Sequence, residues 1–172
     1  MTARPPSRSL AALTLATLAL AAPSARAEYA WTSPATECLP LKGEAGKVNY
    51  TSNGVFNEST TASAKVTCPI PYEFHTFNTV PYTPTWSVAY VDPNTASTTR
   101  LSCTFIVADS RGREVYTTTK TAPLATTETQ TFAFSVAASY FNGPNSFGVT
   151  CTLPKGPTAA TRAGLRTIRL YR

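Results

Sequence analysis

The four cysteines constrain the fold of this chain more than any other feature. They stand at Cys38, Cys68, Cys103 and Cys151 in a sequence of 172 residues. No two of them are close enough to form a CxxC knuckle, and one histidine does not complete an ordinary zinc set, so a metal centre is the weaker interpretation. An even number of cysteines in an exported chain favours two disulfides instead.

The N-terminus has the pattern of an export signal. A basic front is followed by an apolar stretch over residues 10–22 and by the small-x-small triplet ARA, which ends at Ala27. The apolar stretch is too short for a typical membrane span. We therefore expect residues 1–27 to be a signal peptide and residues 28–172 to form one domain that is secreted or periplasmic.

The mature chain is mildly basic and of single-domain size. Removing the signal leaves 145 of the 172 residues, and because three of the fifteen basic residues lie in the signal, the formal net charge falls from +6 to +3. This charge makes no case for a nucleic-acid partner. No later segment is apolar for long enough to span a membrane. We expect no cofactor.

Segments of alternating polarity recur along the mature chain and predict β-strands. The strongest are RLSCTFIVAD (100–109), SFGVTCTLPK (146–155), ETQTFAFSVA (128–137), SAKVTCPI (63–70) and TWSVAYVD (85–92). The weaker ones are KVNYT (47–51), GVFN (54–57), EVYTTT (114–119) and LRTIRLYR (165–172). About nine strands without a convincing helix predict an all-β fold, an antiparallel β-sandwich of the jelly-roll or immunoglobulin-like kind.

Two details of this pattern predict local arrangement. TWSVAYVD is apolar on both faces, so we expect it to be a central strand. The polar, glycine-containing turn in DSRGRE (109–114) joins two strand patterns, so we expect a hairpin there.

The positions of the cysteines favour one of the three possible pairings. Cys103 and Cys151 lie in the middle of apolar stripes that face the same interior. Cys38 lies in a proline-rich entry segment, and Cys68 lies at the end of a strand. We therefore predict the bridges Cys38–Cys68 and Cys103–Cys151.

The cysteine contexts, taken in order, resemble those of a group of uncharacterised secreted bacterial proteins. The matching elements are CLP at 38–40, YTSNGVFNES at 50–59, VTCPI at 66–70, LSC ending at Cys103 and VTCTLP ending at Pro154. The resemblance covers nearly all of the mature domain. It implies a disulfide-braced β-sandwich, and it carries no activity and no residue role beyond the cysteines.

One stretch gathers aromatic side chains around the only histidine of the chain. On this stretch the candidate ligand-binding residues are Tyr72, Phe74, His75, Phe77, Tyr82 and Trp86. Rings on a proline-restricted loop can stack on sugars or grip a peptide. Our main interpretation is that the stretch crosses one end of the sandwich and closes the core, and a ligand surface is the alternative.

The usual catalytic patterns are missing from the sequence. A triad would need His75 as base with Asp92 or Asp109 as its orienting group, and no serine lies in a GxSxG elbow. The acidic residues are scattered beside turns and strand ends, where we expect them to be solvated, and no DxDxDG calcium loop occurs. We therefore predict that the protein is not an enzyme.

The C-terminal segment carries the arginines Arg162, Arg166, Arg169 and Arg172. Our main interpretation is a charged edge strand that prevents sheets from associating, and contact with an anionic cell-envelope polymer is the alternative.

Together these features predict an exported, non-catalytic module that binds a surface, a glycan or a protein. The alternative is a structural or assembly protein of the cell envelope, a spore or the extracellular matrix.

Overall fold

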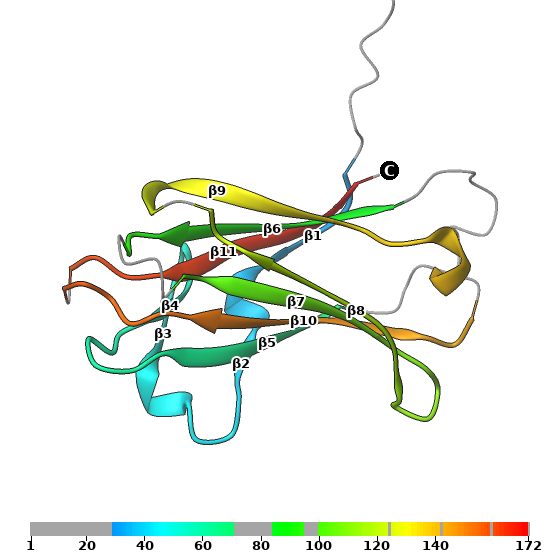
Figure 1. Cartoon of the computed structure of the whole chain (residues 1–172), viewed down its shortest axis with the longest axis horizontal. Helices are drawn as coiled ribbons and strands as arrows, with labels where there is room; N and C mark the ends of the chain where they lie inside the picture. The colour runs from blue at the N-terminus through cyan, green and yellow to red at the C-terminus, as the bar shows by residue number, and fades with distance from the viewer. Residues whose placement is uncertain are drawn as a thin grey trace, which may run out of the picture.

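Two antiparallel β-sheets pack face to face as a sandwich, which confirms the predicted fold class (Figure 1). The computed structural model describes residues 29–70, 84–94, 100–123, 125–141, 143–158 and 160–171. The predicted signal peptide, residues 1–27, lies outside these ranges.

The six-stranded sheet, here sheet A, includes the C-terminal strand. Its strands are β1 (Tyr29–Pro34), β3 (Val48–Thr51), β4 (Gly54–Asn57), β6 (Thr85–Asp92), β9 (Thr126–Ser135) and β11 (Gly164–Tyr171). Their order is β3-β4-β11-β6-β9, and β1 pairs with β11 beyond the end of β4.

The five-stranded sheet, here sheet B, contains three of the four cysteines. Its strands are β2 (Leu39–Pro40), β5 (Ala64–Ile70), β7 (Ser102–Ala108), β8 (Glu114–Thr121) and β10 (Ser146–Leu153), in the order β2-β5-β10-β7-β8. Short 3₁₀ turns occur as η1 (Ala35–Glu37), η2 (Ala45–Lys47) and η4 (Ala138–Phe141).

The described strands alternate between the sheets along the chain. Only β3–β4 and β7–β8 are consecutive strands of one sheet, which fits a jelly roll better than an immunoglobulin sandwich. All nine predicted strand segments are confirmed, and so is the hairpin between β7 and β8, where the Gly112 N–H donates to the Asp109 carbonyl oxygen at 2.9 Å. Two strands, β1 and β2, were not predicted from the sequence.

Alternating side chains of both sheets fill the core. On β10 the burial alternates strictly, with Phe147, Val149, Cys151 and Leu153 facing inward. The sheets meet through aromatic contacts such as that between Phe105 and Phe134, whose ring centroids are 5.9 Å apart. The core therefore follows from the period of two in the sequence.

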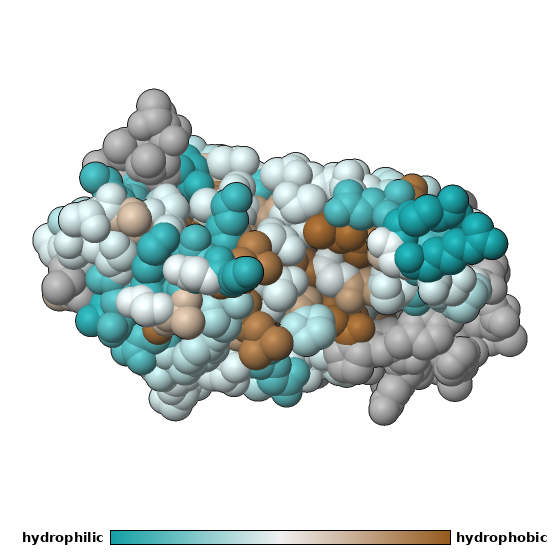
Figure 2. Space-filling model, turned by 90° about the horizontal axis from the view of Figure 1, so that it is seen from below, coloured by the Kyte–Doolittle hydropathy of each residue, from teal (hydrophilic) through white to brown (hydrophobic). Residues whose placement is uncertain are grey.

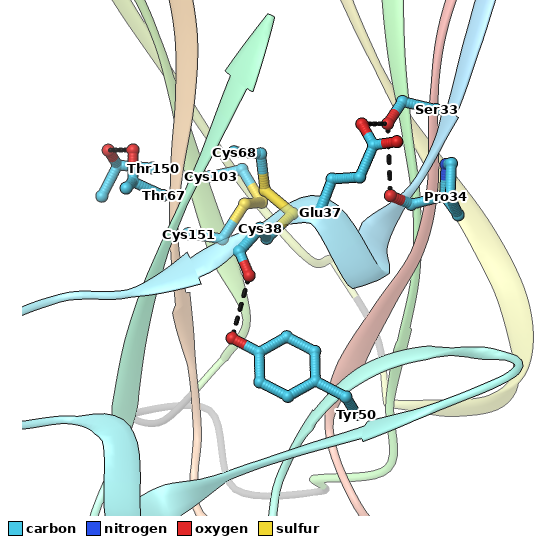
Figure 3. Close-up of a disulfide and its surroundings, with 10 residues drawn as sticks. All are labelled: Ser33, Pro34, Glu37, Cys38, Tyr50, Thr67, Cys68, Cys103, Thr150 and Cys151. Carbon is cyan, nitrogen blue, oxygen red and sulfur yellow. Dashed lines mark hydrogen bonds between the residues drawn. A yellow bond between two sulfur atoms is a disulfide. The ribbon is translucent and has the colours of Figure 1, made fainter.

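Both predicted disulfides are confirmed, and both lie on the inner side of sheet B. Cys103 and Cys151 are directly opposite on the paired strands β7 and β10. Cys38, which follows η1, is joined to Cys68 on β5, and the Tyr50 hydroxyl donates to the Cys38 carbonyl oxygen at 2.9 Å (Figure 3). The bridges thus connect the entry segment and three strands of the same sheet.

The predicted positions of two strands have different outcomes. β6 lies between β11 and β9, which confirms that TWSVAYVD is central. The interpretation of the C-terminal segment as an edge strand is wrong, because β11 is paired with β6 on one side and with β4 and β1 on the other. Arg166 and Arg169, the two arginines on β11, therefore lie in the middle of sheet A and do not guard an edge.

None of the described residues belongs to a helix long and apolar enough to cross a membrane.

Candidate functional site

The aromatic stretch singled out from the sequence lies mostly outside the described residues. This holds for Tyr72, Phe74, His75, Phe77 and Tyr82. Trp86, on β6, is described and is fully buried. Its ring packs against those of Trp31, Phe105 and Phe147, so this one member of the predicted set is a core residue.

The two aspartates considered as partners of a catalytic histidine hold the backbone of turns. Asp92 at the end of β6 accepts hydrogen bonds from the Leu101 N–H at 2.7 Å and from the Asn94 N–H at 3.2 Å. It is fully buried, so the expectation that the acidic residues are solvated is wrong for Asp92. Burial, and secondarily the Asp92 charge, raise the pKa of Tyr90.

Asp109 opens the β7–β8 hairpin. Its carboxylate accepts hydrogen bonds from the backbone N–H groups of Arg111 and Arg113, and it pairs with the Arg113 guanidinium at 2.7 Å. The Arg113 backbone bond is the largest cause that lowers the pKa of Asp109 below its usual value of 3.8. These contacts stabilise the β7–β8 turn. His75, which a triad would need as its base, lies outside the described residues.

A cleft of about 600 Å³ lies over one end of sheet A. It crosses β4, β11 and β6 and is bordered by the start of β9 and by the connection between β10 and β11. The residues that determine its chemistry are Phe56, Arg166, Arg162, Asn53, Thr127 and Thr161. This size is within the range of small-ligand sites.

Phe56 forms an aromatic part of the cleft wall. Its neighbour Val55 is fully buried, so on a strand Phe56 faces outward. Phe56 is directly opposite Gly164 on β11. A Cβ atom on Gly164 would lie 2.4 Å from the ring atom Cδ1 of Phe56, so only glycine lets the ring occupy this place. The absence of a side chain at position 164 therefore positions the ring.

Arg166 enters the cleft because the register of β11 shifts at this residue. Towards β6, Leu165 is opposite Tyr90 and Thr167 is opposite Ala89, so Arg166 is the extra residue of a β-bulge. Towards the other side, β4 ends its pairing at Leu165 and β1 begins its pairing at Thr167. Arg166 thus has no cross-strand partner on either side, and bulges are known to re-aim side chains in this way.

The Arg166 guanidinium lies over the Phe56 ring, 5.2 Å from the ring centroid. Its Nη1 donates to the Asn53 carbonyl oxygen at 3.4 Å, while its buried Nε has no hydrogen-bond partner. A buried donor without a partner costs about 1–3 kcal/mol. The second arginine of the cleft, Arg162, forms an ion pair with Glu58 at 2.8 Å.

The described residues that line the cleft are suited to binding, and none of them supplies the groups that the catalytic mechanisms considered above require. Its described lining includes the hydroxyl groups of Thr51, Thr127 and Thr161, and it contains no carboxylate, cysteine or histidine. A glycosidase would need two facing carboxylates. Within the described ranges, no group of three or more His, Cys, Asp or Glu could hold a metal ion. A positive guanidinium, an aromatic ring and hydroxyls together fit a polar ligand that carries an anionic group.

The sequence signalled only part of this site. The arginine-rich C-terminal segment was noted, and contact with an anionic polymer was the alternative interpretation. Phe56 lay in a weak strand segment and was not considered. It is 110 positions from Arg166, and only the pairing of β4 with β11 brings the two together.

No protein-family model matches this chain, and no curated protein matches it. Among solved structures it is similar to a xylan-binding module, with 10% identity and a TM-score of 0.46 over 72% of this chain and 80% of that one. It is also similar to an isomalto-dextranase of Arthrobacter globiformis complexed with panose, with 16% identity and a TM-score of 0.41 over 81% of this chain and 22% of the enzyme. For a xylanase of Cellvibrio japonicus in complex with xylopentaose, the identity is 12% and the TM-score 0.40, over 72% and 24% of the two chains.

This chain thus spans about a quarter or less of the length of the two enzymes. The three TM-scores lie below 0.5 and are too low to assign it a function.

Proposed function

We propose that this protein is an exported, non-catalytic module that binds an anionic glycan in the cleft on sheet A. The observation that carries the proposal is Arg166, which a bulge places over the ring of Phe56 with a buried Nε that has no partner. A sugar that carries a carboxylate or sulfate would place its anionic group on the guanidinium and its hydroxyls against Asn53 and the threonines of the rim.

Export is supported by the two disulfides. Disulfides of this structural kind form and persist in oxidising compartments such as the periplasm and the extracellular space. Both bridges are buried in the core of the sandwich, where they stabilise the fold and do not take part in thiol chemistry. A secreted or periplasmic location fits a module that binds a polymer of the cell envelope or of the surroundings.

A glycan array followed by calorimetry would test the function. We expect uronate or sulfated oligosaccharides to bind, and we expect Arg166→Gln to lower their affinity by about 10- to 100-fold, because a hydrogen bond to a charged group contributes about 1.5–3 kcal/mol. Phe56→Leu should lower the affinity by a smaller factor. Raising the salt concentration should weaken the binding of the wild type.

The matched control is Arg111→Gln. It removes the same charge from the exposed β7–β8 turn, and the turn's hydrogen bonds with Asp109 use the Arg111 backbone and not its side chain. An equal loss of affinity in both variants would mean that only the net charge matters, and it would contradict the cleft as the site. Failure of every anionic glycan to bind the wild type would also contradict it.

Assembly through sheet edges is a second candidate function. β8 and β9 are the last strands at one edge of sheets B and A, and the ten residues of β9 include one charged residue, Glu128. Uncharged edge strands are ready to pair with other chains. Sedimentation at high concentration tests this: a strict monomer would contradict assembly, and growth of oligomers that Thr129→Lys prevents would support it.

A further inference from the structure

The outer face of sheet B carries an ordered row of threonines. Thr67 is opposite Thr150, Thr150 is opposite Thr104, and Thr104 is opposite Thr119, so the row crosses four neighbouring strands. The Thr104 and Thr119 hydroxyl oxygens are 2.8 Å apart, and those of Thr150 and Thr67 are 3.4 Å apart. The inner face of these strands carries the disulfides, and Figure 3 shows Thr67 and Thr150 on the side away from the sulfur atoms.

A hollow of about 300 Å³ lies beside this row. Its lining combines the hydroxyls of Thr67 and Thr150 with the apolar side chains of Leu39, Pro69 and Ile106. Leu39, on β2, is 59% exposed, so its apolar side chain is available at the surface beside the hollow. Figure 2 views the side of the molecule on which β2 and β5 lie, and apolar surface gathers there near the middle, between hydrophilic ends.

The floor of the hollow is open because position 148, in the middle of β10, is a glycine. A Cβ atom there would meet only the Cys68 carbonyl oxygen at 3.8 Å, which is an ordinary contact, and the backbone of Gly148 does not have a positive φ. By contrast, a Cβ on Gly54 would meet the Leu165 carbonyl oxygen at 1.9 Å, and Gly164 accommodates the Phe56 ring. Neither packing nor backbone conformation therefore requires the glycine at 148.

A glycine inside a strand often marks a bulge, a tight bend, or a place where a ligand or another backbone approaches closely, and the pairings of β10 show no bulge. Gly148 is on β10, which is paired along its length with β5 on one side and β7 on the other. The disulfide Cys103–Cys151 links β10 to β7 three residues further along the strand. The hollow is thus held by a braced part of the sheet. A preformed site of this kind binds with a smaller loss of conformational entropy.

The lining determines the kind of ligand. None of the described residues around the hollow is charged, so nothing there would compensate a charge on the ligand. An extended peptide would bind by adding to a sheet edge, and here the main chain is already paired on both sides of β10. A second copy of the chain would need a largely apolar contact surface, and the threonine row interrupts this one. A sugar ring presents C–H groups on its faces and hydroxyls at its rim, which matches an apolar floor beside a row of hydroxyls.

We propose that the hollow over Gly148 is a second carbohydrate site that takes an uncharged sugar ring of an oligosaccharide. It is separate from the cleft proposed above, because the two lie on the outer faces of opposite sheets. The ring would lie over Gly148 between Leu39 and Ile106, and its hydroxyls would bond to Thr67 and Thr150.

The test fills the hollow without disturbing the core. Gly148→Val adds a side chain that strands favour, into space that is open, so we expect the thermal unfolding temperature to stay the same or rise. The binding of neutral hexasaccharides of β-1,4-linked glucose, xylose, mannose and N-acetylglucosamine is then measured by calorimetry on wild type and variants. We expect at least one of them to bind the wild type and to bind Gly148→Val at least tenfold more weakly.

Three other variants keep the test decisive. Thr152→Val, on the same face of β10 but outside the hollow, should bind like the wild type, whereas Leu39→Asn should bind several-fold more weakly. Arg166→Gln should not change this neutral binding, so a failure of the anionic cleft is distinguishable from a failure of this site. Wild-type affinity in Gly148→Val, or the absence of binding by all four hexasaccharides, would overturn the proposal.

Discussion

The two outer faces of the sandwich obtain their concave surfaces in opposite ways. In sheet A the register shifts at three strand pairs, β1–β11, β11–β6 and β6–β9, and the cleft is centred on one of these shifts, at Arg166. In sheet B the pairings of β10 with β5 and β7 run over seven residue pairs each without interruption. The β7–β8 pairing of sheet B also shifts register, between Val107 and Ala108, but the hollow lies over β10, whose pairings are regular, and it results from one missing side chain, that of Gly148.

This difference corresponds to the placement of the disulfides. The Cys103–Cys151 bridge joins two strands of sheet B and the Cys38–Cys68 bridge joins the entry segment to it, while among the described residues sheet A contains no cysteine. In sheet A, buried polar side chains hold neighbouring backbone segments. Asp92 at the end of β6 accepts from the Leu101 N–H, and Asn57 at the end of β4 donates to the Leu153 carbonyl oxygen. We infer that the disulfides let sheet B lack a side chain at Gly148 with little loss of stability. In sheet A, the bulge lets Arg166 present a charged side chain to the cleft.

The largest effect is expected when the brace of sheet B is removed. The double substitution Cys103→Ala/Cys151→Ala opens a loop with a sequence separation of 48 residues, and the loop-entropy model gives a loss of about 4 kcal/mol in the free energy of unfolding. Because domains of this size are stable by about 5–15 kcal/mol, the variant should be marginal. Urea unfolding measures the loss.

The control for this prediction is Cys38→Ala/Cys68→Ala, which opens a shorter separation of 30 residues and should cost nearly as much by the same model. Measuring binding to the folded fraction of the Cys103→Ala/Cys151→Ala variant compares this bridge with the hollow directly. If the Cys103–Cys151 bridge supports the hollow over Gly148, neutral-sugar binding should fall more than anionic-glycan binding. A loss of less than about 1 kcal/mol in both variants would mean that the bridges do not brace the sandwich.

A smaller effect is expected from the polar anchor of sheet A. Asp92→Ala removes the acceptor of the Leu101 and Asn94 N–H groups in a fully buried place, and we expect a loss of about 3 kcal/mol in the free energy of unfolding. Asp92→Asn keeps one acceptor oxygen and should lose about half as much. The hollow on sheet B should be unaffected, as judged by neutral-sugar binding to the folded fraction. Equal stability of the alanine variant and the wild type would show that the anchor is unimportant.

The smallest effect concerns the β7–β8 turn and depends on pH. Because its hydrogen bonds lower the pKa of Asp109 below 3.8, the carboxylate stabilises the fold above the pKa of the unfolded chain, and this stabilisation is lost as the pH falls through the lower, folded-state pKa. Asp109→Asn should therefore unfold at a slightly lower temperature than the wild type at pH 7, and the difference should shrink below about pH 3.8. Thermal scans between pH 2 and pH 7 measure this.

The control for the turn is Glu128→Gln. This exposed carboxylate on β9 makes no side-chain hydrogen bond or ion pair with any described residue, so Glu128→Gln should unfold at nearly the same temperature as the wild type at every pH in this range. A difference between wild type and Asp109→Asn that grew as the pH fell would contradict the direction of the pKa shift.

Local patterns accounted for much of the fold. The strict alternation in Phe147, Val149 and Cys151 predicted both the strand and its inner face, because a period of two is visible within one segment. The pairing of Cys103 with Cys151 followed from two such stripes. β1 and β2 were missed because a short, proline-containing segment has little pattern of its own and is a strand only through its partner, β11 or β5.

The cleft on sheet A could be predicted from the sequence only in part. The arginines of the last strand were visible in the sequence, but their alternation with apolar residues resembled an edge strand. The correct assignment depends on which strands flank β11. The contact of Arg166 with Phe56 depends further on a one-residue bulge, and register cannot be derived from a single strand.

By itself the sequence determined what is encoded at short range: an all-β chain with inward stripes, turns at polar glycine-containing segments, and cysteines placed to pair across the interior. The tertiary structure alone decided which strands are neighbours, that Arg166 lies over Phe56 in sheet A, and that Gly148 leaves a hollow beside a row of threonines in sheet B. The physical reason is that side-chain alternation is a property of one strand, whereas strand order, bulges and the space above a glycine exist only after distant segments have paired.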